Sequence, residues 1–583
     1  MAAVSRRAIA HARWSLRWCF SLSVVLYSIG PAAVSTQPPS PAAPILGPAD
    51  VSAVLNAAAA SLSDSTLAVA VVDRAGSILG VVARSGASPA VHDQAVSLAR
   101  TGAFFSNDRA PLSSRTVRFI SGIHFPPGVP NTPPAALYGI ENTNRGCQLD
   151  ALDEGIFTQP FPRPRSIEGT FGPTVAGQAA VPLPCRPGDT RGCSPGITTG
   201  KPDARDSAGL PLAGPVNPGG LPLYRGGRVI GGIGIAGVSP DRAEYAAAVG
   251  ATGAAGTGIT TAISFPAALP LPGAVFLDGL RLPFFSNCTT SACVLASVSR
   301  PPAGASAGGL SGVTTVVAPR SGIQAPEGYL IGPSASAVSG GLTEAEVRRL
   351  VEQAVAKANV TRAQIRLPLG QTTRMIIAVS DETGRFLAAF RMPDATFFSF
   401  DVATAKARNA YYFSSREGYD VLRQFVESNP YDEYRWEPQP PAGQGWAITN
   451  RTLSFGGQPL FPPGIDLEKH PTPGPWFDLF QYDLANPCSE GPGPSRGGNP
   501  DFLNQSGIVW FPGSAPLYKG GRLVGGIGVS GDGVEQDDYV TAGAVVGFEP
   551  PPELRADRSF IVTGEGKSVR LPYWKFPRNP EIR

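Results

Sequence analysis

The chain contains 583 residues, including 69 glycines and 60 prolines, and it carries a formal net charge of +3. Glycine and proline together make up about 22% of the residues, against roughly 12% in average proteins, so long regular elements should be scarce. Hydrophobic residues make up 42% of the chain, which excludes wholesale disorder. Basic and acidic residues are nearly balanced, at 48 and 45, which excludes the strongly basic surface of a typical nucleic-acid-binding protein.

Residues 1–36 have the order of a signal peptide. Four arginines without any acidic residue come first, an apolar run follows from Cys19 to Ile29, and small residues surround Ala33–Ser35. The alternative is a membrane anchor, but this run is too short to cross about 30 Å of hydrocarbon as a helix, and no later stretch is long enough. We therefore expect a secreted or periplasmic protein whose mature chain has no transmembrane segment.

After the leader, the chain repeats itself. Six pairs of segments match in the same order, and each pair shares most of its apolar, glycine and charged positions. The pairs are Leu46–Val51 with Leu342–Val347, Val71–Gly76 with Val379–Gly384, Asp93–Arg100 with Asp401–Arg408, Arg115–Gly128 with Arg451–Gly464, Pro222–Gly234 with Pro516–Gly528, and Arg281–Phe284 with Arg570–Tyr573. Ordered matches over this length predict two copies of one domain, at residues 46–286 and 342–583, joined by a Gly/Ser/Pro-rich linker at 287–341.

The second copy gives the clearer local patterns. Thr343 and Glu346 form a capping box that begins an amphipathic helix. Residues 374–379 and 385–391 predict a hairpin, a second helix follows over 399–413, a second hairpin joins 508–517 to 522–529, and 537–545 predict a closing helix. The fold class is therefore α/β, of the α+β kind, with an antiparallel sheet and packed helices in each copy. Long loop insertions are expected near 130–218 and 416–510.

These residues resemble a known family. The Asp-x-x-Gly turn that ends at Gly384, the segment Ser399–Ala407 and the hairpin Pro516–Gly531 together look like the GlcG/HbpS-like haem-binding family. The second copy is the closer match, because Lys406, Ser530 and Asp537 are replaced in the first copy by Leu98, Ala236 and Ala243. The resemblance implies profilin-like domains that form symmetric oligomers, and members that bind haem or take part in its handling outside the cytoplasm.

Charged residues on the second helix are candidate ligand contacts. Asp401, Lys406 and Arg408 could neutralise haem propionates or an acidic substrate, and Asp93 and Arg100 occupy the matching positions of the first copy. The alternative for this set is a solvated helix face.

Haem iron is usually held by His, Cys, Met or Tyr. His92 could face a pocket, or it could be a polar residue at a helix start. Tyr411 and Tyr412 align with Phe104 and Phe105, so packing in the core competes with ligand binding for both. Core packing is the default for Met375 and Met392.

Six cysteines follow the leader, and an even number in an exported protein favours disulfides over zinc. They are Cys147, Cys185, Cys193, Cys288, Cys293 and Cys488. Cys185 with Cys193 and Cys288 with Cys293 would close local loops. Cys147 and Cys488 would then bridge the two copies, or each would remain a free thiol.

The run Gly-Gly-Ile-Gly lies inside an expected strand and opens no helix, so it is not a dinucleotide-binding loop. No nucleophile elbow or zinc-ligand spacing is present. We expect a protein that binds haem or another small molecule, as an oligomer or as a pseudo-dimer within one chain. The alternatives are an enzyme or accessory factor acting on haem or a small organic acid, and a structural assembly module.

Overall fold

The structure is a computed structural model. It describes residues 44–122, 125–126, 132–144, 218–252, 276–277, 279–286, 288, 291–463, 472–486, 489, 491 and 506–582. The expected leader and the larger part of the first insertion lie outside these residues. Two sheets organise the described residues, and we call residues 44–317 the first half and residues 328–582 the second half.

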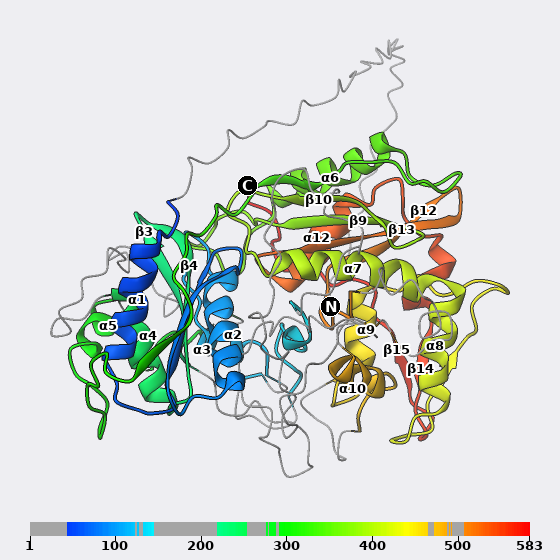
Figure 1. The fold of residues 1–583 in the computed structure, drawn as a ribbon. Helices are drawn as coiled ribbons and strands as arrows, with labels where there is room; N and C mark the ends of the chain where they lie inside the picture. Colours follow the sequence, from blue (N-terminus) through cyan, green and yellow to red (C-terminus); the bar gives the residue numbers. More distant parts are fainter. Residues whose placement is uncertain are drawn as a thin grey trace, which may run out of the picture. The chain divides into compact units, whose positions relative to one another are not determined.

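The first half is built on a five-stranded antiparallel sheet with the order β3-β4-β1-β2-β7. Helices α1 and α4 contact each other, whereas α2 packs on β4, β1 and β3 (Figure 1). The elements of this half are α1 (Pro48–Ala60), β1 (Ala68–Asp73), β2 (Ile78–Arg84), α2 (Pro89–Phe105), α3 (Ser114–Phe119), β3 (Gly220–Arg225), β4 (Arg228–Ala236), α4 (Pro240–Thr252), β5 (Phe276–Leu277), β6 (Leu280–Arg281), α5 (Ser291–Ser297) and β7 (Val313–Val317).

The second half has a sheet of the same kind, with the order β12-β13-β9-β10-β8. A small three-stranded sheet, β11-β14-β15, accompanies it. The elements of this half are β8 (Gly328–Ile331), α6 (Glu344–Ala358), β9 (Ile376–Asp381), β10 (Phe386–Arg391), α7 (Ser399–Ser414), α8 (Arg416–Glu427), β11 (Arg435–Glu437), α9 (Asn450–Gly456), α10 (Phe477–Ala485), β12 (Ser514–Lys519), β13 (Arg522–Ser530), α12 (Val534–Ala544), β14 (Phe560–Val562) and β15 (Ser568–Arg570).

The expected mixed α/β architecture is confirmed, and so is the capping box, because Thr343 Oγ1 accepts from the backbone of Glu346. The second hairpin begins later than predicted, at Ser514. The backbone before it is bonded to side chains instead: Val509 N donates to Asn409 Oδ1 and Ile508 N to Asp483 Oδ1. The segment expected as a linker contains α5, and it also adds an outer strand to each sheet, β7 to the first and β8 to the second.

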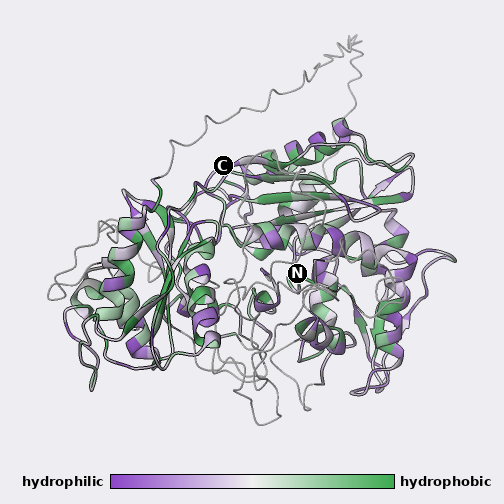
Figure 2. Cartoon of the chain, in the orientation of Figure 1, coloured by the Kyte–Doolittle hydropathy of each residue, from purple (hydrophilic) through white to green (hydrophobic). Residues whose placement is uncertain are grey.

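The repeated glycines bring helix and sheet together. A Cβ atom on Gly234 of β4 would lie 1.9 Å from the carbonyl oxygen of Ala95 in α2, and one on Gly528 of β13 would lie 2.0 Å from that of Ala403 in α7. No side chain fits at such distances, so a strand glycine is required where each helix crosses its sheet. Figure 2 shows hydrophobic residues along the strands of both sheets.

The matched segments make matched bonds in both halves. Arg115 pairs with Glu244 at 2.9 Å, and Arg451 pairs with Asp538 at the corresponding place. The hydroxyl of Ser113 donates to the carbonyl oxygen of Phe284 at 2.6 Å. In the second half, Thr449 Oγ1 donates to the carbonyl oxygen of Tyr573 at 2.7 Å. These bonds fix the ends of each repeated unit to its short helix, α3 or α9.

The two halves contact each other through an aromatic pair and a buried ion network. The rings of Phe105 and Phe398 stack at 4.2 Å between centroids. Asp394 accepts from Arg74 at 2.7 Å and from Arg366 at 2.6 Å. Burial acts to raise the pKa of Asp394, but the two arginines hold it well below its usual range, so the carboxylate stays charged.

Candidate functional site

Lys406 and Asp537 form a buried ion pair beside β13. Lys406 Nζ lies 3.0 Å from Asp537 Oδ2, and it also donates to the carbonyl oxygen of Val529 at 2.9 Å. The aromatic ring of Phe511 lies 4.9 Å from the same nitrogen. Neither charged side chain is more than 3% exposed. Asp537, Val529 and Phe511 therefore occupy positions from which a ligand could otherwise contact the ammonium group.

Burial is the largest influence on both members of this pair. It raises the pKa of Asp537 to about 7, although Lys406 acts to lower it. It also lowers the pKa of Lys406, against the attraction of Asp537. Each group is therefore pushed toward its neutral form, as expected for charges that have been removed from water.

Arg408 and Arg100 make corresponding hydrogen bonds in the two halves. Arg408 Nε donates to the carbonyl oxygen of Gly384 at 2.7 Å, and Arg100 Nε donates to that of Gly76 at 3.0 Å. Both glycines lie in the turn of the first hairpin, at positive φ. Each arginine is buried, so neither the solvated helix face nor a ligand contact is needed to explain it. Both fasten a helix to a turn.

Asp401 lies close enough to Arg100 for their charges to interact, although the two belong to different halves. Burial raises the pKa of Asp401 to about 6, while the charge of Arg100 acts to lower it. Asp93, at the matching position of α2, likewise acts on Arg100. The structure thus brings Asp93, Arg100 and Asp401 together, and it places Lys406 with a different partner.

Tyr412 and the two methionine candidates belong to the core, whereas Tyr411 is partly exposed. Tyr412 is 1% exposed and packs on Phe413 in an aromatic cluster of the second half. Met375 and Met392 are buried, and the backbone N–H of Met375 donates to the sulfur of Met392 at 3.4 Å. Core packing, the default expectation for both methionines, is what the structure shows.

His92 is the one histidine that lies among the described residues. Its Nε2 atom is buried and has no hydrogen-bond partner. Burial lowers the pKa of His92, so the ring is neutral at pH 7 and retains a lone pair. A neutral imidazole nitrogen of this kind is the usual haem-iron ligand.

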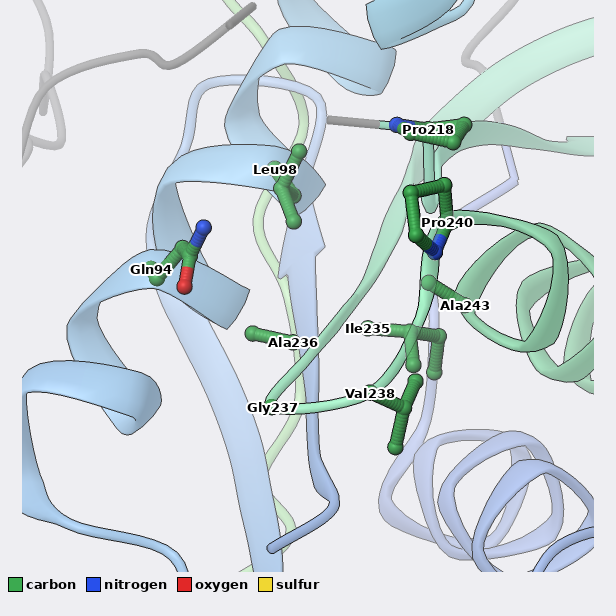
Figure 3. A pocket seen from close by; sticks show the side chains of 9 residues that line it. All are labelled: Gln94, Leu98, Pro218, Ile235, Ala236, Gly237, Val238, Pro240 and Ala243. Carbon is green, nitrogen blue, oxygen red and sulfur yellow. The ribbon is translucent and has the colours of Figure 1, made fainter. Parts of the chain in front are cut away.

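A pocket of about 210 Å³ lies in the first half between α2, the end of β4 and the start of α4. Gln94 and Leu98 face it from α2, Ile235 and Ala236 from β4, and Ala243 from α4 (Figure 3). No charged residue lines it among those that the structure describes. The pocket is therefore suited to an uncharged molecule.

This pocket occupies the position of the ion pair in the other half. Leu98 corresponds to Lys406, and Ala243 corresponds to Asp537, so shorter and apolar side chains leave space where the second half has two charged ones. Sequence comparison alone gave these differences as departures from the family pattern. It did not reveal the pocket, because it could not show that Leu98 and Ala243 face each other across β4.

Of the cysteines, the structure joins Cys288 to Cys293 by a disulfide bond. Cys147, Cys185, Cys193 and Cys488 lie outside the described residues. Within the described ranges no group of three or more His, Cys, Asp or Glu side chains could hold a metal ion. No helix in that same part of the chain is long and apolar enough to cross a membrane.

Residues 477–545 match the model of a family described as haem degrading protein HbpS-like. This HbpS-like segment contains α10, β12, β13 and α12, and with them Asp537. No curated protein matches the chain.

Three solved structures are similar to part of the chain. They are PduOC in complex with haem, at 17% identity and a TM-score of 0.19, the Klebsiella pneumoniae protein ORFY, at 18% and 0.20, and a doubly substituted HbpS from Streptomyces reticuli, at 19% and 0.18. Each covers 36% of this chain, and the matches span 95%, 94% and 90% of the respective solved chains.

The described residues offer a ligand for haem iron, but the pocket that they form is too small for haem. His92 offers an unpartnered ring nitrogen. However, a pocket of about 210 Å³ is smaller than the roughly 300–1,000 Å³ of pockets for drug-sized ligands, and haem is a large member of that class. The pocket beside Leu98 therefore cannot enclose a porphyrin.

Proposed function

We propose that this is an exported protein, built from two tandem HbpS-like domains, that binds haem or a related small ligand. The match of residues 477–545 to a family whose description names haem carries the proposal. Four strands of each sheet have the same order, β3-β4-β1-β2 in the first half and β12-β13-β9-β10 in the second, and together with the matched arginine–carboxylate pairs they support the tandem arrangement.

His92 is the residue that would hold the haem iron. It lies in the first turn of α2, near Asp93, and its Nε2 atom has no hydrogen-bond partner. Arg100 and Arg408 are not available for the haem propionates, because both are buried and bonded to turn carbonyls. Contact with haem would therefore involve the start of α2, where His92 lies, and not the pocket beside Leu98.

Titration with haemin tests this function. The full chain should shift the Soret band with saturation at a defined stoichiometry. The His92→Ala variant should lose the shift, and Tyr411→Phe, which removes the hydroxyl of a second candidate on α7, should keep it. Absence of any shift in the unaltered protein would overturn the proposal, and an equal shift in His92→Ala would overturn the assignment of the ligand.

Haem degradation is a second candidate, favoured by the family description. It predicts that the Soret absorbance decays with time after binding when a reductant and dioxygen are both supplied. A Soret band that remains constant under those conditions would leave binding as the function.

A further inference from the structure

The pocket beside Leu98 in the first half differs from the corresponding position in the second half, because a charged pair fills that position. In the second half, Lys406 and Asp537 extend toward each other from α7 and α12 and bond beneath the end of β13. In the first half, Leu98 and Ala243 come from the corresponding helices, α2 and α4, and the pocket remains between them. A glycine follows the matching strand in each half, Gly237 after β4 and Gly531 after β13.

The lining selects a chemical class of ligand. The side chains of Leu98, Ile235 and Ala243 present carbon, and the Gln94 carboxamide adds a group that can both donate and accept a hydrogen bond. An ionised ligand would lose its hydration without gaining a counter-charge from the lining, which is costly. A neutral molecule with an apolar body and one polar group matches all of these side chains.

The volume limits the size of the ligand. A dry cavity of about 150 Å³ in another protein accepts benzene, so a pocket of about 210 Å³ accommodates a single ring with a small substituent. The wall is not fully apolar, because Gln94 lies at one side of the pocket, opposite Pro240 (Figure 3). A hydroxyl or carbonyl group on the ligand would find its partner there.

We propose that the first half carries a binding site for a compact uncharged molecule of about one aromatic ring with one hydrogen-bonding substituent. The site is the pocket between α2, β4 and α4, and Gln94 orients the polar group. In the second half, Lys406 and Asp537 occupy the corresponding place. The site does not depend on haem binding, and its size separates it from any haem site.

Phenol and toluene are suitable probes, measured by titration calorimetry and ligand-observed NMR on the full chain. Phenol should bind at one site per chain. Leu98→Phe, which fills the pocket, should reduce phenol binding at least tenfold. Gln94→Leu should weaken phenol about fivefold, the typical effect of one neutral hydrogen bond, and should leave toluene binding unchanged. The toluene measurement shows whether the Gln94 variant keeps a folded pocket.

A reciprocal variant of the second half gives the matched control. Replacing Lys406 by Leu and Asp537 by Ala copies the first half, and it should raise the number of phenol sites from one to two. The proposal is overturned if phenol does not bind, if Leu98→Phe binds it as the unaltered protein does, or if Gln94→Leu weakens both probes equally. Haemin binding without phenol binding, or the reverse, distinguishes a failure of this site from a failure of the proposed haem function.

Discussion

Lys406 Nζ lies 3.0 Å from Asp537 Oδ2 in the interior of the second half, and the corresponding residues of the first half are Leu98 and Ala243. The same structural position is therefore occupied differently in the two halves. The second half has a desolvated ion pair there, and the first half has a small pocket.

Removing one member of the pair should cost more than removing both. Lys406→Leu leaves Asp537 buried without its cation, and we expect a loss of about 3 kcal/mol in the free energy of unfolding. Lys406→Leu combined with Asp537→Ala leaves no unpaired charge, so the double variant should be less destabilised than the single one. Urea unfolding of the three proteins measures this difference. A double variant that loses at least as much stability as Lys406→Leu would show that the unpaired carboxylate of Asp537 is not the source of the loss.

Asp401 should make stability depend on pH. Because burial raises its pKa to about 6, the folded protein holds this proton more tightly than the unfolded chain does. Its contribution is fully present below about pH 4 and is lost as the pH rises through 6, and it amounts to at most about 2–3 kcal/mol. Asp401→Asn should therefore flatten the fall in stability between pH 4 and 7.

Chemical denaturation at several pH values checks this prediction. The exposed Asp420→Asn variant, which alters an ion pair on the surface of α8, serves as the control. Equal pH profiles for Asp401→Asn and the unaltered protein would show that this carboxyl group is not perturbed.

Gly528 should tolerate no side chain. The Cβ atom of an alanine would lie 2.0 Å from the carbonyl oxygen of Ala403, so α7 must move away from β13, at a cost of about 3 kcal/mol or more. Gly520 is the matched control, because it has a φ of +57° and no atom within 4 Å of the corresponding Cβ position. Gly520→Asn should cost less than about 1 kcal/mol, since Asn accepts the left-handed conformation. Thermal unfolding of both variants should separate them clearly.

Cys147 and Cys488 are expected to form a disulfide bond between the halves. Both lie outside the described residues, but each is five residues from a contact that joins the halves, in which Asn142 Nδ2 donates to Asp483 Oδ2 at 2.6 Å. Five residues of chain span up to about 17 Å, so the length of the chain permits the bridge. Peptide mapping without reduction should recover the linked pair alongside the Cys288–Cys293 loop. Alkylation of both Cys147 and Cys488 in the folded protein would contradict the bridge.

Much of the fold could be predicted from the sequence, because the spacing of apolar residues and the residue preferences of turns are local properties of the chain. The capping box at Thr343, the hairpin turns at Gly384 and Gly520 and the helix that carries Asp401 all lie where the pattern indicates. The strands β7 and β8 were missed, since they lie in a Gly/Ser-rich segment and owe their conformation to pairing with β2 and β10.

The site was less predictable, because burial depends on distant segments. Lys406 lies on a helix whose charges looked suited to solvent or to a ligand, yet its partner Asp537 is 131 residues further along the chain. Similarly, the sequence repeats Arg115 as Arg451 but does not show that each meets a carboxylate on the closing helix, Glu244 or Asp538. Such ion pairs can be identified only once the packing of the helices is known.

Because both sheets belong to one chain, the sequences of the two halves can change independently. In an assembly of two identical subunits, every substitution appears twice, so loss of a buried ion pair would weaken both members together. Here Leu98 and Lys406 are encoded separately. One half can keep a rigid, charged interior while the other acquires an opening, and the two can diverge without either having to satisfy the requirements of the other.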